Sequence, residues 1–198
     1  MGGLFTPELI ERLKQKKIPI IAIGRYYDQI DSVSTDVTQG VYLGVRYLLD
    51  QGYRKICYIN CPQIYRSNAE RVAGVQKAMR EFHLEMKPDW LVYCKHNTGE
   101  GGYEAIKRLW QSGARPQAIA AANEPIALGI MRFLYEQDIR IPEDIAIVSY
   151  EDSVLGGYAV PALTSVNIQK EYMGELAARI MLKRISKRAG RRTRAYYC

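Results

Sequence analysis

Residues 117–150 read QAIAAANEPIALGIMRFLYEQDIRIPEDIAIVSY and contain a strand, a helix and a second strand in immediate succession. QAIAAA at 117–122 is a short, unbroken apolar run, which is typical of a strand buried on both faces. The segment from about 124 to 137 predicts a helix, and IPEDIAIVSY at 141–150 contains the next strand. Two strands joined by a helix predict a right-handed crossover and parallel pairing.

The alternation of strands and helices extends over almost the entire chain. Further strands are expected at 18–24, 55–60, 90–94 and about 164–166, and further helices from Thr6, at 37–51, from Ser67 to about 82, from Thr98 to about 112, and at 169–186. Ser67-Asn68-Ala69-Glu70 has the S-x-x-E pattern of a capping box, in which the serine hydroxyl accepts a hydrogen bond from the first helical turn. The fold class is therefore α/β, with parallel sheets flanked by helices.

Composition excludes several classes of protein. The 198 residues, 47% of them hydrophobic, suffice for one large domain or two small ones. No apolar run approaches the roughly 18 residues of a membrane-spanning helix, and the charged N-terminal segment lacks the apolar core of a secretory signal. The four cysteines, at 57, 61, 94 and 198, form no C-x-x-C pair, and there are two histidines, so neither a metal nor another cofactor is expected. We expect reduced cysteines and a cytoplasmic protein.

The net charge of +7 comes from the C-terminal region rather than from the rest of the chain. Seven bases lie there with no acid among them: Lys183, Arg184, Lys187, Arg188, Arg191, Arg192 and Arg194. Without these seven, the bases equal the 21 acids in number. We therefore interpret residues 183–194 as a solvated tail, with a phosphate-binding arm as the alternative.

Polar side chains follow the expected strands, and ligands of parallel α/β sheets bind at the carboxyl ends of the strands. The candidate site residues are Tyr26, Asp28, Ser67, Arg71, Thr98, Asn123 and Glu151. Ser67, Thr98 and Asn123 also suit helix N-caps, and capping alone is the alternative explanation for them. For Glu151, the alternative explanation is that its carboxylate lies in a loop, exposed to solvent, and binds no ligand. Arg71 lies in the first turn of a helix, where the dipole disfavours a cation, and this favours a ligand or ion-pair role.

No motif in the sequence predicts catalysis. There is no G-x-x-x-x-G-K-[ST] phosphate loop, no G-x-S-x-G elbow and no G-x-G-x-x-G after a strand. An enzyme that uses His96 or the acids at 151 and 152 is the least favoured alternative, because neighbours in sequence rarely face one reacting centre. We therefore expect no catalytic residue.

Several longer phrases, in order along the chain, resemble the LacI/GalR family of bacterial transcriptional regulators. They are IPIIAIGR (18–25), VSTDVTQGVYLGVRYLLDQGYRKICYI (33–59), ERVAGVQKAM (70–79), GYEAIKRLWQSGARPQAIAAANEPIALGIMRFLYEQDIRIPEDIAIVSYED (102–152) and PALTSVNIQKEYMGELAA (161–178). The resemblance covers about residues 3 to 185. It implies the effector-binding core of such a regulator, with a periplasmic-binding-protein-like fold in which a small effector binds between two subdomains.

The resemblance also implies roles for individual residues. Arg71 matches the family arginine that contacts the effector, and Asn123 matches the asparagine of the A-N-D motif. Glu151 stands where the family normally has the first aspartate of Y-D-D or F-D-D, and Glu124 likewise replaces an aspartate. Two further pocket-lining positions are Ser67 and Thr98.

The same resemblance implies a division of the chain and a set of partners. Residues 35–163 would form a complete C-terminal subdomain, and residues 1–34 and 164–198 part of an N-terminal one. The helix-turn-helix and the first two β-α units of the family are expected to be absent from this chain. The implied partners are a saccharide effector, a second copy of the chain, and DNA through the absent domain; no membrane is expected. A stand-alone sugar-binding protein of the periplasmic type is the alternative.

Overall fold

The chain folds into two compact units. Unit 1 comprises Met1–Asp36 with Gln169–Cys198, and unit 2 comprises Val37–Ile168. The computed structural model describes residues 6–63, 67–186 and 194–197. Among these residues, no helix combines the length and the apolar character needed to cross a bilayer.

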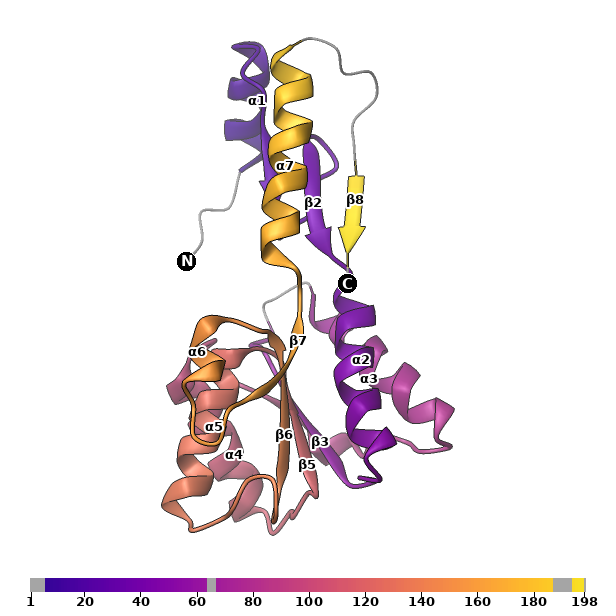
Figure 1. The fold of residues 1–198 in the computed structure, drawn as a ribbon, viewed down its shortest axis with the longest axis vertical. Helices are drawn as coiled ribbons and strands as arrows, with labels where there is room; N and C mark the ends of the chain where they lie inside the picture. Colours follow the sequence, from indigo (N-terminus) through magenta and orange to yellow (C-terminus); the bar gives the residue numbers. More distant parts are fainter. Residues whose placement is uncertain (1–5, 64–66, 187–193, 198) are drawn as a thin grey trace. The chain divides into compact units, whose positions relative to one another are not determined.

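Unit 2 is a three-layer α/β sandwich (Figure 1). Its parallel strands lie in the order β4-β3-β5-β6-β7 and are β3 (Ile56–Asn60), β4 (Leu91–Tyr93), β5 (Ala118–Ala121), β6 (Ala146–Glu151) and β7 (Thr164–Asn167). Its helices are α2 (Val37–Asp50), α3 (Asn68–Glu81), the 3₁₀ turn η1 (Pro88–Trp90), α4 (Gly99–Gln111), α5 (Glu124–Glu136) and α6 (Val154–Gly157). α2 and α3 cover one face of the sheet, and α4 and α5 cover the other.

The sheet of unit 2 is buried on both faces, which explains why its strands read as apolar runs. Every residue of β3 and β5 is buried. With the inner faces of the helices these strands form one core, which includes Ile59, Ile119 and Leu134. Burial of each such side chain contributes about 1.5–3 kcal/mol relative to exposure. β7 pairs with β6, so unit 2 continues past the boundary that the sequence placed at 164.

Local capping sets several helix boundaries. Thr98 and Asn123 accept hydrogen bonds from the backbone N–H groups of Gly101 and Ile126, at 3.2 and 3.1 Å, as N-cap residues do. Ser67 has no such bond, because its own backbone is already in the right-handed helical conformation. The predicted capping box at Ser67 is therefore wrong, although α3 begins where it was expected.

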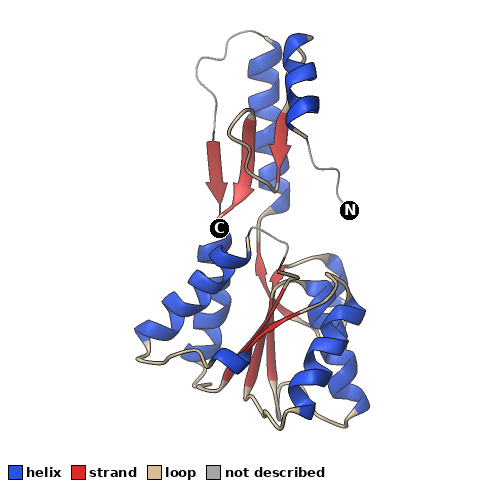
Figure 2. Cartoon of the chain, turned by 180° about the vertical axis from the view of Figure 1, so that it is seen from behind, coloured by secondary structure: helices blue, strands red, loops and turns tan. Residues whose placement is uncertain are grey.

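Unit 1 contains a three-stranded parallel sheet with a helix on each face (Figure 2). Its strands lie in the order β1-β2-β8, and its elements are α1 (Pro7–Gln15), β1 (Ile21–Ile23), β2 (Asp31–Thr35), α7 (Lys170–Ile185) and β8 (Arg194–Tyr197). Ala22 packs with Ile10 of α1, whereas Ile21 and Val33 pack against α7. Successive strand residues point to opposite faces, so the two helices cover opposite faces.

The interpretation of residues 183–194 as a solvated tail is wrong at both ends. Lys183 and Arg184 belong to the last turn of α7. Arg194 begins β8, whose backbone pairs with the edge of β2 from Ser32 onward. The other four bases of that segment, Lys187, Arg188, Arg191 and Arg192, lie outside the described residues.

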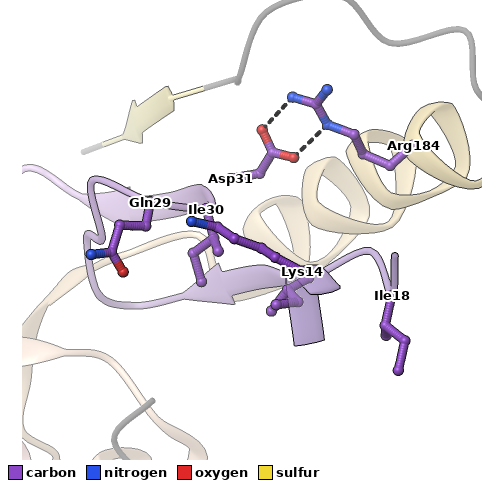
Figure 3. Close-up of a pocket in the computed structure, with 7 residues that line it drawn as sticks. Lys14, Ile18, Gln29, Ile30, Asp31 and Arg184 are labelled. Atoms are coloured by element: carbon purple, nitrogen blue, oxygen red, sulfur yellow. Dashed lines mark hydrogen bonds and ion pairs between the residues drawn. The ribbon is translucent and has the colours of Figure 1, made fainter. Parts of the chain in front are cut away.

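An ion pair fixes α7 against the sheet of unit 1. Asp31, at the start of β2, accepts hydrogen bonds from Nε of Arg184 at 2.6 Å and from its Nη2 at 2.8 Å (Figure 3). The hydrogen bond to Asp31 raises the pKa of Arg184. Both side chains line a pocket of unit 1, with Lys14, Ile18 and Ile30 among its walls. The predicted site residues do not line this pocket.

Removal of Arg184 is expected to loosen α7. Asp31 is only 4% exposed, so Arg184→Ala deprives a buried carboxylate of two charge-assisted bonds. We expect a loss of about 1–3 kcal/mol in the opening free energy of α7, measured by native-state hydrogen exchange. The control is Arg179→Ala on the same helix, whose pair with Glu175 is exposed and contributes about 0.5 kcal/mol or less. Equal effects of the two variants would contradict the assigned role.

Candidate functional site

Three of the predicted site residues lie at adjacent strand ends of unit 2. β3, β5 and β6 are neighbours in the sheet. Arg71 and Asn123 follow β3 and β5, and Glu151 ends β6. Because the strands are parallel, their carboxyl ends meet at one edge, where α/β proteins bind ligands. We call Arg71, Asn97, Asn123, Tyr150 and Glu151 the polar edge of unit 2.

Arg71 extends from the first turn of α3 to the end of β5. It is 8% exposed, and its Nη1 donates to the carbonyl oxygen of Ala122 at 2.6 Å. Its guanidinium carbon lies 5.4 Å from the ring centroid of Tyr150, in β6. Nε is buried without a hydrogen-bond partner among the described residues. The arginine therefore connects α3, the end of β5 and β6, and the hydrogen bond to Ala122 uses only one of its five N–H groups.

Arg71 is a permanent cation that lies near the neutral side chains of Tyr58 and Cys61. Burial lowers the pKa of Arg71, but the nearby Tyr58 hydroxyl and Cys61 thiol raise it, and the net effect is a raised pKa. Burial raises the pKa of Tyr58 and of Cys61, and the charge of Arg71 opposes both shifts. At neutral pH Arg71 is charged, whereas Tyr58 and Cys61 stay protonated.

Asn123 belongs to a small network of amides. Its Oδ1 caps α5, and its Nδ2 donates to Oδ1 of Asn97 at 2.5 Å. The Cys61 thiol lies 3.6 Å from the same Asn97 oxygen and 3.7 Å from Nδ2 of Asn123. Asn123 is 4% exposed and Asn97 is exposed. The hydrogen bond between Asn123 and Asn97 therefore links a buried amide at the end of β5 to an amide that is exposed to solvent.

The backbone at Glu151 is strained. Glu151 and Asp152 have φ of 110° and 52°, in the region that favours glycine. Each such residue costs on the order of 1–3 kcal/mol and persists only where its surroundings fix it. Asp152 is fixed by β7, because its N–H donates to Oγ of Ser165 at 3.0 Å and its Oδ2 accepts from Asn167 at 2.8 Å. Strain of this kind is typical of ligand-binding sites.

The remaining predicted site residues are placed differently. Ser67 precedes α3 and is half-buried, and Thr98 is exposed and caps α4. Tyr26 and Asp28 lie in unit 1, in the loop after β1, where the Tyr26 hydroxyl donates to Asp28 at 2.5 Å. Their role stays a prediction.

Three residues with contacts near this edge are not among the seven candidate site residues; two of them, Asn97 and Tyr150, follow expected strands in the sequence, whereas Asn60 was not predicted. Asn97 and Tyr150 follow or end strands, as the predicted residues do, and that position was the available signal. Asn60 is fully buried, and its Oδ1 accepts the N–H of Cys61 at 2.9 Å. Its Nδ2 has no partner among the described residues. Asn60 is the polar last residue of the apolar run KICYIN, and this position could have marked it as a candidate.

This set of groups is suited to binding a polar small molecule. Arg71 and the amides donate hydrogen bonds, and Glu151 accepts them. Such a combination fits a compound with several hydroxyl groups. In the part of the chain that the structure describes, no three His, Cys, Asp or Glu side chains gather as metal ligands.

Sequence comparison finds relatives among repressors. A family model for the periplasmic binding protein-like domain matches residues 45–196. The HTH-type transcriptional repressor PurR of Klebsiella pneumoniae is 32% identical over 158 residues, which cover 80% of this chain and 46% of the repressor. The PurR of Mannheimia succiniciproducens is 29% identical over 185 residues, or 93% and 55% of the two chains. The chain thus spans about half the length of these relatives.

Solved structures of regulators share the fold. The transcriptional regulator CelR in complex with cellobiose has a TM-score of 0.85 at 28% identity, over 96% of this chain and 59% of CelR. A LacI family regulator from Enterococcus faecium with bound ribose has a TM-score of 0.84 at 25% identity, over 97% and 72%. CcpA of Lactococcus lactis has a TM-score of 0.84 at 26% identity, over 98% and 71%.

A parallel sheet whose carboxyl edge gathers a buried arginine, amides and a carboxylate is typical of proteins that bind small molecules. The chain belongs to the family of periplasmic binding protein-like domains, in the form found as the effector-binding region of LacI/GalR-type transcriptional regulators. The predicted fold class and the resemblance drawn from the sequence are confirmed.

The buried thiols of unit 2 are expected to resist modification in the folded protein. Burial raises the pKa of Cys94 to about 12 and also raises those of Cys57 and Cys61. At pH 8 each therefore has a smaller thiolate fraction than free cysteine. In a Cys198→Ser variant, we expect Ellman's reagent to modify no thiol within minutes before urea is added, and all three afterwards. Rapid native modification of Cys61 would contradict its buried place beside Asn123.

Proposed function

We propose that this chain is the effector-binding region of a LacI-type transcriptional regulator and that the effector binds at the polar edge of unit 2. The observation that carries the proposal is the position of Arg71. A guanidinium buried between the Ala122 carbonyl and the Tyr150 ring is costly to maintain for packing alone. It lies at the same sheet edge as Asn123 and Glu151, which supports a common ligand for the three side chains.

The effector that suits this edge is a neutral saccharide. Sugar hydroxyls both donate and accept hydrogen bonds, so they can satisfy the donors of Arg71 and the acceptor oxygens of Glu151 together. A phosphate would meet the carboxylate of Glu151 as well as the cation, and like charges repel. The cellobiose and ribose complexes of two structural relatives support the same class of ligand.

In the full-length regulator, effector binding would change the affinity of a helix-turn-helix domain for DNA. A ligand that binds two states of the protein with different affinities shifts the population between them, and this couples the two sites. The regulator would act in the cytoplasm as a homodimer, and sedimentation velocity of this chain tests the dimer directly. The repressor relatives support a regulatory rather than an enzymatic role.

Substitution of Arg71 is expected to weaken sugar binding selectively. We would titrate the chain with cellobiose, D-ribose and D-ribose 5-phosphate by calorimetry, expecting binding of at least one neutral sugar. Arg71→Gln removes hydrogen bonds from a charged donor, which corresponds to a loss of affinity of about tenfold or more. Arg71→Lys keeps the charge but loses the planar fork, and should also bind more weakly.

Arg132→Gln is the matched control, because Arg132 is an exposed arginine on α5 whose ion partner is Glu136. It should bind the sugar as the wild type does. Circular dichroism of each variant separates loss of binding from loss of fold. Wild-type affinity in a folded Arg71→Gln variant would contradict the assigned site, and binding of D-ribose 5-phosphate alone would contradict the assigned class of effector.

A further inference from the structure

A buried carboxylate lies next to the polar edge, at the start of α5. Glu124 is 2% exposed. Its Oε1 accepts the backbone N–H of Ser153 at 2.7 Å, and its Oε2 accepts the Ser153 hydroxyl. The first turn of a helix favours an anion, because its free N–H groups carry partial positive charge. Glu124 thereby connects α5 to the segment that follows β6.

That segment fits closely around the carboxylate. A Cβ atom on Gly156 would lie 2.6 Å from Oε1 of Glu124, so a residue with a side chain would collide there. The Ser153 hydroxyl also accepts the N–H of Leu155 at 3.3 Å and so caps α6. A glycine and an N-cap therefore both depend on where Glu124 lies.

Glu124 holds the residue two positions after Glu151. Glu151 and Asp152 have rare positive φ values, and such conformations relax when their neighbours no longer fix them. Asp152 is held by β7 and Ser153 is held by Glu124. With both neighbours on its carboxyl side anchored, Glu151 keeps its strained conformation at the polar edge.

We propose that Glu124 is a positioning residue for effector binding, whose carboxylate fixes Ser153 and thereby holds Glu151 in the conformation that contacts the effector. The part that concerns the effector rests on the proposed function. The claim that Glu124 fixes Ser153 does not depend on the proposed function. The fixing of Ser153 and the effect on effector binding are therefore tested by separate measurements.

Hydrogen exchange of the full chain without ligand tests whether Glu124 fixes Ser153. Glu124→Gln keeps the size of the side chain but places an amide NH₂ against the two donor groups of Ser153. We expect the amides of 152–156 to exchange about tenfold faster or more, while those of β5 and the urea midpoint stay as in the wild type. Glu136→Gln, the same change at the other end of α5, should leave 152–156 unaffected.

Unchanged exchange at 152–156 in Glu124→Gln would overturn the proposal, and so would an increase spread evenly over unit 2. If Glu124→Gln fails to fold, Ser153→Ala takes its place, because it keeps the carboxylate and removes one hydrogen bond. A smaller increase confined to the same segment is then the expected result. No increase there would again overturn the proposal.

Calorimetry with cellobiose and D-ribose tests the positioning. Glu124→Gln should weaken binding of the sugar that the wild type binds by about tenfold. In a Glu151→Ala background the same change should have no further effect, because Glu124 acts through Glu151. Additive losses would show an independent effect and overturn the proposal. If the wild type binds neither sugar, the proposed function fails, and hydrogen exchange alone then decides whether Glu124 fixes Ser153.

Discussion

Burial of the unit 2 sheet on both faces is the constraint on which the rest of the molecule depends. A polar side chain on either face would lose its water without gaining a partner, at a cost of several kcal/mol. Helices cover both faces, so polar side chains gather beyond the ends of the strands. The strands are parallel, and their carboxyl ends therefore share one edge. Arg71, Asn123 and Glu151 meet there for this reason, although they are far apart in the sequence.

The residues of the polar edge also hold the fold together. Asn123 caps α5 and bonds to Asn97, and Arg71 bonds to the backbone at the end of β5. Groups that are fixed by such contacts lose little conformational freedom when a ligand arrives, and this favours affinity. The same overlap means that a substitution at the edge acts on folding and on binding together. Only measurements that report both can separate the two roles.

Structural elements could be predicted from the sequence where the interactions that determine them are local. Apolar runs located the strands of unit 2, and Thr98 and Asn123 marked the starts of two helices by capping. The strand-end rule located Arg71. β2 was missed because DSVST has no apolar run, and β8 because pairing with β2 joins segments about 160 residues apart. The positive φ of Glu151 depends on contacts from α5 and β7, which no local pattern encodes.

The central claim is that a small neutral sugar binds at the polar edge of unit 2. The most direct test is chemical-shift mapping of the ¹⁵N-labelled chain during titration with cellobiose and with D-ribose. The account predicts that at least one sugar moves the backbone and side-chain amide signals of Asn97 and Asn123 together with the backbone signals of Tyr150 and Glu151. Signals that move instead around Lys14 and Arg184, at the pocket of unit 1, would contradict it. So would a spectrum that neither sugar changes.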